Sequence, residues 1–113
     1  MIFAALILFI LAALFGMFSI FYVWQGETPP RVLAYTHGSF ATLGIACLAI
    51  GTYSITGFWI SLGLFILAAL GGLYLFTHDL KGKKIPKLVA TIHGLVAILA
   101  VVVLVGFIIH YYL

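Results

Sequence analysis

Two histidines, His37 and His93, are the residues of this sequence best suited by type and spacing to chemistry. Each lies seven residues after a proline, Pro30 or Pro86, that is expected to open a helix. An imidazole nitrogen is a common metal ligand, and a histidine inside an apolar helix is costly enough to suggest a function. At ~1.5 Å of helical rise per residue, each side chain would lie roughly 10 Å inward from the start of its own helix, and both helices would start at the same membrane face. If both point inward, their rings could bind one metal ion through two axial nitrogens.

An internal repeat makes the two histidines equivalent. The second half of the chain matches the first at an offset of 56 residues without a gap, and the segments 8–14 and 64–70 are identical. Further matched pairs in the same frame are Gly16 and Gly72, Gly26 and Gly82, Pro30 and Pro86, Ala34 and Ala90, Gly38 and Gly94, and Ala41 and Ala97. We therefore divide the single domain into repeat one, 1–56, and repeat two, 57–112.

The composition predicts an integral membrane protein. Hydrophobic residues make up 66% of the chain and charged residues only 6%, whereas roughly a quarter of a soluble domain is charged. Four apolar segments cover about 2–24, 32–50, 58–76 and 88–112, and each could cross a hydrocarbon core of ~30 Å as a helix. The first has no basic segment before it, so we expect a mature helix and not a secretion signal. The predicted fold is an all-α, antiparallel four-transmembrane-helix bundle of two hairpins, with pseudo-two-fold symmetry along the membrane normal.

The distribution of charge predicts an orientation. The basic residues all lie in or beside the first and third connections: Arg31, Lys81, Lys83, Lys84 and Lys87. Since Lys and Arg are enriched on the cytoplasmic side of membrane proteins, we expect both connections in the cytoplasm. Both termini and the uncharged turn 51–57 would then lie on the non-cytoplasmic side of the membrane, which in a bacterium would be the inner membrane. No basic stripe suits nucleic acid.

Small residues flank each histidine at helical spacing. Glycine follows each directly (Gly38, Gly94), and the positions three before, four after and seven after are Ala34, Ala41 and Gly44 in repeat one and Ala90, Ala97 and Ala100 in repeat two. Such a stripe would leave room for a flat macrocycle, and bundle cytochromes hold haem between two histidines. It would also suit close helix packing, with histidine as an interhelical hydrogen-bonding group. A bare metal or a proton path is a third interpretation, although a bare-metal site usually needs more ligands.

Two further histidines and two cations are weaker candidates. His78 ends the third span and is interpreted as a solvated interfacial residue, with a ligand, a proton relay or a contact to a haem propionate as alternatives. His110 lies near the other end of the fourth span, where a second haem would need a ligand from another protomer. Arg31 and Lys87 open the histidine helices at matched positions, so they could bind the propionates. Membrane topology alone also explains them.

The two His-Gly pairs resemble those of small bacterial four-helix membrane cytochromes of the b type. They stand in the segments Tyr35-Thr36-His37-Gly38 and Thr91-Ile92-His93-Gly94. The likeness covers the whole chain in architecture, and its specific content is these two pairs. It implies one haem b with His37 and His93 as iron ligands, and electron exchange with a quinone or a small oxidant such as superoxide. Members with two haems carry two ligands on each ligand helix, whereas His37 has no second histidine in its span.

Three functions are compatible with these features. The first is electron transfer through a buried bis-histidine haem, which would make the protein an oxidoreductase; a homodimer could help to enclose the macrocycle. The second is a cofactor-free membrane anchor or assembly subunit of a larger complex. The third is a small transporter, which the lack of acidic residues within the spans disfavours. Hydrolytic catalysis is not expected, because Glu27 and Asp79 lie in connections and no nucleophile–base pair is evident.

Overall fold

The computed structural model confirms an all-helical fold with four long helices. The structure describes residues 1–113, except for the side chain of Thr56. Helix α1 spans Ile2–Trp24, α2 spans Arg31–Thr52, the short 3-10 helix η1 spans Thr56–Phe58, α3 spans Trp59–Leu80 and α4 spans Lys87–Tyr112. All four long helices are long and apolar enough to cross a membrane.

The turn between α2 and α3 is shorter than predicted. The segment 51–57 is an uncharged turn in the sequence-based prediction, but α2 continues to Thr52 and η1 takes up part of the remainder. The Thr52 hydroxyl donates a hydrogen bond to the Ala49 carbonyl at 2.8 Å, and the side chain is buried. A polar residue therefore stays helical here because its hydroxyl is satisfied within the last turn.

Glycines in the left-handed conformation end α1 and α3. Gly26 has φ +81° and Gly82 has φ +67°, a region that residues with a Cβ rarely adopt. The amide after each glycine donates at 2.9 Å to a carbonyl five residues earlier, Glu27 to Tyr22 and Lys83 to His78, as in a Schellman motif. Because this glycine sets the end of α3, the helix runs to Leu80. Asp79, which was expected in the connection, therefore lies in the last turn of α3 together with His78.

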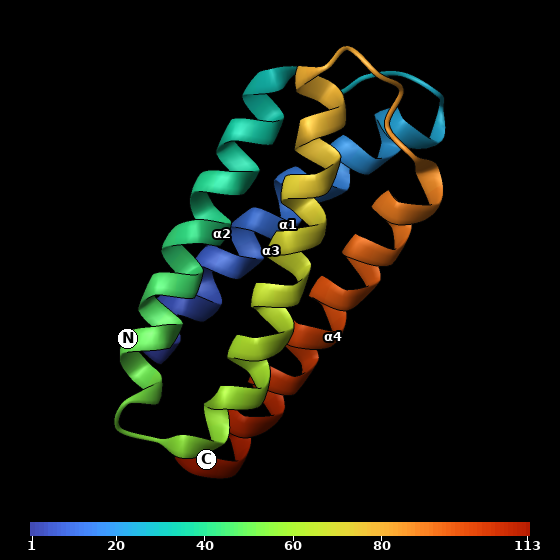
Figure 1. Cartoon of the computed structure of the whole chain (residues 1–113). Helices are drawn as coiled ribbons and strands as arrows, with labels where there is room; N and C mark the ends of the chain where they lie inside the picture. The colour runs from blue at the N-terminus through green and yellow to red at the C-terminus, as the bar shows by residue number, and fades with distance from the viewer.

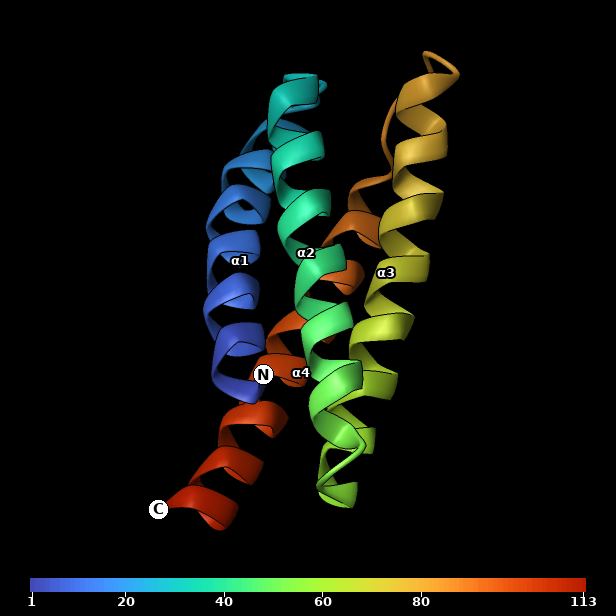
Figure 2. The same ribbon diagram turned by 90° about the vertical axis from the view of Figure 1, so that its left-hand side faces the viewer.

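The four helices form a ring in which each contacts two others. Helix α1 packs along α2 and α3 along α4, while α1 also contacts α4 and α2 contacts α3. Helices α1 and α3 are therefore diagonal, as are α2 and α4. Figure 1 and Figure 2 show the two charged connections, 25–30 and 81–86, at one end of the bundle, with η1 and both termini toward the other end.

Residues at matched repeat positions meet in the core. Phe9 of α1 and Phe65 of α3 stack with ring centroids 3.5 Å apart and planes within 2° of parallel. Leu48 of α2 and Leu104 of α4 belong to the same cluster and are fully buried. The bundle interior at this depth is therefore filled by large apolar side chains from both diagonal helix pairs.

Candidate functional site

The structure brings His37 of α2 and His93 of α4 together inside the bundle. Their ring centroids lie 6.0 Å apart, and the ring planes are nearly perpendicular at 81°. Both side chains are half-buried. Since α2 and α4 are diagonal helices, the two imidazoles reach toward each other across the interior and not along a shared helix contact.

Each imidazole is held by a hydrogen bond to the preceding helix. His37 Nδ1 lies 2.7 Å from the Ala12 carbonyl oxygen, and His93 Nδ1 lies 2.7 Å from the Ala68 carbonyl oxygen. A carbonyl can only accept, so Nδ1–H donates and a neutral ring carries its lone pair on Nε2. Among the described side chains, no protein hydrogen bond involves either Nε2. A metal-ligating histidine typically has this arrangement, with its second nitrogen donating to a carbonyl.

Two glycines of α1 and α3 make these hydrogen bonds possible. A Cβ at Gly16 would lie 3.0 Å from His37 Cε1 and Nδ1, and a Cβ at Gly72 would lie 3.1 Å from His93 Cε1. Each glycine is four residues after the alanine whose carbonyl accepts, so its own amide donates to the same carbonyl in the helix. A Cβ at this position would displace the imidazole from that oxygen by a few tenths of an ångström. His37 therefore packs directly against Gly16, and His93 packs directly against Gly72.

The spacing of the two rings fits ligation of a single metal ion. A metal–imidazole bond is ~2.0–2.1 Å and the ring centroid lies ~1.1–1.2 Å beyond the nitrogen, so two rings on opposite sides of one ion have centroids roughly 6.4 Å apart. The observed separation is 6.0 Å. The described residues contain no group of three or more His, Cys, Asp or Glu side chains suited to a metal. The two imidazoles alone would offer a metal ion two nitrogen ligands, so an ion bound here would need further ligands from another source.

The small residues near the histidines fall into two kinds. A Cβ at Gly38 or Gly94 would meet no atom within 4 Å, so space is open beside both histidines. Gly44, deeper in α2, is different, because a Cβ there would lie 2.8 Å from the Phe9 ring. At Gly44, by contrast with the two His-Gly pairs, Phe9 fills the space that a side chain would occupy. The other small positions are half-buried (Ala34, Ala41, Ala97) or buried (Ala90, Ala100).

The cations at the start of the histidine helices differ from each other. Arg31 Nε lies 3.4 Å from the Asp79 carboxylate, and Arg31 Nη2 donates to the Asp79 backbone carbonyl at 3.4 Å. Arg31 is thus bound to the end of α3. Lys87, its counterpart in the repeat, is exposed at the start of α4. Of the two candidates for a propionate contact, Lys87 is the one without an ion pair among the described residues.

The remaining two histidines lie apart from the pair. His78 is half-buried in the last turn of α3, where its Nδ1 donates to the Tyr74 carbonyl at 3.1 Å and its ring packs on the Tyr74 ring. His110 is exposed near the end of α4. It lines a groove of about 360 Å³ with Val103, Gly106 and Phe107. The contacts of His78 and His110 thus involve neither His37 nor His93.

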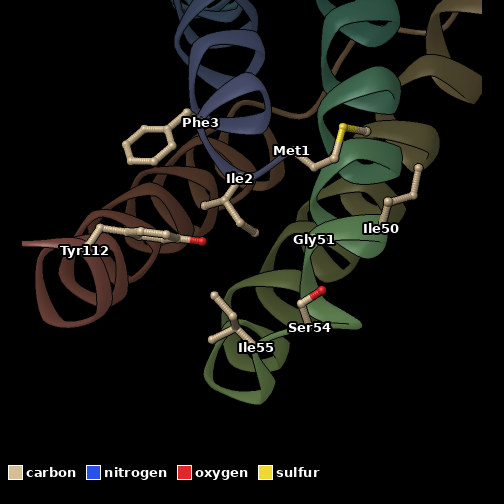
Figure 3. Close-up of a pocket in the computed structure, with 8 residues that line it drawn as sticks. All are labelled: Met1, Ile2, Phe3, Ile50, Gly51, Ser54, Ile55 and Tyr112. Atoms are coloured by element: carbon tan, nitrogen blue, oxygen red, sulfur yellow. The ribbon is translucent and has the colours of Figure 1, made fainter.

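A second pocket lies at the end of the bundle opposite the charged connections. It has a volume of about 280 Å³ and is lined by Met1, Ile2, Phe3, Ile50, Gly51, Ser54, Ile55 and Tyr112. In Figure 3 the Tyr112 side chain reaches toward Ile2, while the Ser54 hydroxyl lies on the opposite side of the opening. Its lining contains no histidine, so this pocket is separate from the histidine pair.

The sequence pointed to the two histidines but not to what holds them. The acceptors are backbone carbonyls, for which Ala12 and Ala68 carry no side-chain signature. The available signal was the matched pair Gly16 and Gly72. No protein-family model, curated protein or solved structure matches this chain, so its function is inferred from the geometry of the histidine pair.

Proposed function

We propose that this protein is an integral membrane cytochrome that transfers electrons through one haem b held between His37 and His93. The observation that carries the proposal is the matched pair of Nδ1 hydrogen bonds. They leave both Nε2 lone pairs available, at a ring separation suited to one iron. The bound haem would supply reversible one-electron chemistry at its iron.

The chain's own groups would orient the ligands and exclude water. The Ala12 and Ala68 carbonyls fix the tautomer and orientation of each imidazole and raise its basicity as a ligand. With both His37 and His93 as ligands, a bound haem would have no free position for oxygen, which would favour outer-sphere electron transfer. The open space at Gly38 and Gly94 would admit the macrocycle edge. A quinone or a small oxidant such as superoxide is the partner proposed for that edge.

The proposed placement is in a bacterial inner membrane, with the charged connections in the cytoplasm and both termini on the other side. It is supported by the apolar character of all four helices and by the location of every Lys and Arg at one end. The proposed pseudo-two-fold axis is supported by three matched features. These are the Nδ1 contacts, the stacked phenylalanines and the left-handed glycines.

Replacement of each histidine by asparagine tests the haem proposal. An asparagine amide can still donate a hydrogen bond to the Ala12 or Ala68 carbonyl, but it does not replace imidazole as an iron ligand. We expect the wild-type protein to bind haem with a low-spin spectrum. His37→Asn and His93→Asn should each lose that spectrum and remain helical and monodisperse. A wild-type protein that stays colourless on titration with haem contradicts the proposal.

A cofactor-free membrane anchor is the second candidate, and the same hydrogen bonds favour it. They link α2 to α1 and α4 to α3, so each histidine also fastens its own hairpin. Interhelical hydrogen bonds in membranes contribute roughly 0.6 kcal/mol on average. For an anchor, asparagine should restore the stability that alanine removes, and neither wild type nor variant should bind haem.

A further inference from the structure

The connection between α3 and α4 carries a concentration of positive charge without acidic partners. Its four lysines are all exposed: Lys81, Lys83, Lys84 and Lys87. Among the described residues the one ion pair joins Arg31 to Asp79, whose side chain is only 11% exposed. The acid nearest in sequence to the lysines is therefore already neutralised by an arginine, and the lysines remain available to an outside anion.

The fold of this connection does not require the lysines. The first connection makes the same left-handed glycine turn at Gly26 that the third makes at Gly82. At the positions matching Lys81, Lys83 and Lys84 it has Gln25, Glu27 and Thr28. Lys84 Nζ also lies 3.7 Å from the Cβ position of Gly26, so it reaches over the first connection. Positive charge thus extends from the third connection over the first through Lys84, and both connections lie at one end of the bundle in Figure 1.

Exposed leucines flank the lysines on both sides. Leu80, which precedes Lys81, is 54% exposed, and Leu88, which follows Lys87, is 72% exposed. A phosphate held by the lysines would thus have apolar side chains next to it on the helix sides. This combination fits an amphiphile that has an anionic head and an acyl chain. A free phosphate, or the acidic surface of a soluble protein, would contact the lysines but would leave the leucines without an apolar partner.

We propose that the lysine connection, residues 81–87, binds the phosphate of an anionic phospholipid, with the acyl chain against Leu80 and Leu88. The proposal rests on the membrane placement and not on the haem. A single lysine near an anionic membrane surface raises the local concentration of anionic lipid by about fivefold. Lysine suits this role because its flexible stem can follow a mobile headgroup.

The two tryptophans of the chain provide a reporter and a matched control. Trp24 is exposed at the end of α1, beside the charged connections, and Trp59 is exposed at the start of α3, at the opposite end. Trp59→Phe leaves Trp24 as the single fluorophore, and Trp24→Phe leaves Trp59. Each variant is reconstituted in phosphatidylcholine vesicles containing phosphatidylglycerol or phosphatidylcholine that is brominated near the glycerol end of one acyl chain.

We expect half-maximal quenching of Trp24 to need at least about threefold less brominated phosphatidylglycerol than brominated phosphatidylcholine, as mole fractions. This difference between the two lipids should shrink at high salt, which screens the lysine charges. Trp59 should be quenched equally by both lipids. The preference at Trp24 should disappear in Lys81→Ser/Lys83→Ser/Lys84→Ser and persist in the corresponding triple arginine variant. Since brominated lipid is present in both leaflets, the direction of insertion does not affect the result.

Three outcomes would overturn the proposal. These are equal quenching of Trp24 by both lipids, a preference that survives in the serine variant, and displacement of the lipid by millimolar inorganic phosphate, which would indicate a free-phosphate site. The haem spectrum of the serine variant separates this proposal from the cytochrome proposal. It should equal that of wild type, because none of the three lysines lies at the histidine pair.

Discussion

Substitution of the two imidazole-supporting glycines by alanine should weaken haem binding without destabilising the helices. The Cβ of Gly16→Ala would lie 3.0 Å from His37 Cε1 and Nδ1, so the ring must retreat by a few tenths of an ångström from the carbonyl that it now contacts at 2.7 Å. Loss of such a supporting hydrogen bond typically lowers metal affinity 10- to 100-fold, and partial loss should give about tenfold. Alanine is meanwhile favoured over glycine in a helix by about 1 kcal/mol.

Gly71→Ala is the matched control for this experiment. It makes the same change one residue before Gly72, but its Cβ would meet His93 only at 3.6 Å, an ordinary contact. Haem titration into detergent-solubilised apoprotein gives the affinity, and chemical denaturation gives the stability. We expect weaker haem binding for Gly16→Ala and Gly72→Ala and wild-type binding for Gly71→Ala. Equal affinities for all three variants would refute the role assigned to the glycines.

Three further substitutions and one control variant test the fold around the site. Gly82→Ala should cost about 1 kcal/mol of stability in chemical denaturation, because φ is +67° there and no neighbouring atom meets the added Cβ. Gly44→Ala should cost about 1–3 kcal/mol by overpacking against a core phenyl ring, whereas Gly106→Ala, with no atom within 4 Å, should not destabilise. Asp79→Asn should change stability by less than about 1 kcal/mol, because its partner Arg31 is 50% exposed. A tighter haem complex in this variant would show that Asp79 withholds Arg31 from a propionate.

The number of helices and the proximity of His37 to His93 could be predicted because both depend on patterns within the chain. Apolar length gave the four helices, and the repeat distinguished His37 and His93 from His78 and His110. The helix ends were less accurate, since hydrophobicity declines before the backbone turns. The end of α3 is set by Gly82, not by the last apolar residue.

Contacts that break the repeat could not be predicted from it. The repeat equates Arg31 with Lys87, which led to one role for both. The structure instead pairs Arg31 with Asp79, whose counterpart in repeat one is the apolar Val23. Lys87 consequently has no equivalent acid to bind.

The structural role of each small residue could not be predicted from the sequence either. A glycine can serve helix packing, ligand clearance or support of an imidazole, and the pattern alone is the same in all three cases. Only the packing of α1 against α2 assigns Gly16 to His37 and Gly44 to Phe9. The open space at Gly38 is likewise a property of the assembled bundle.

The haem-to-protein ratio and spin state of the purified protein test the central proposal most directly. Expression with haem supplied, followed by optical spectra of the oxidised and reduced protein, should give one low-spin haem b per chain. That spectrum should be absent from both His37→Asn and His93→Asn. A wild-type chain that binds no haem, or a low-spin spectrum that survives in either variant, would contradict ligation by this histidine pair.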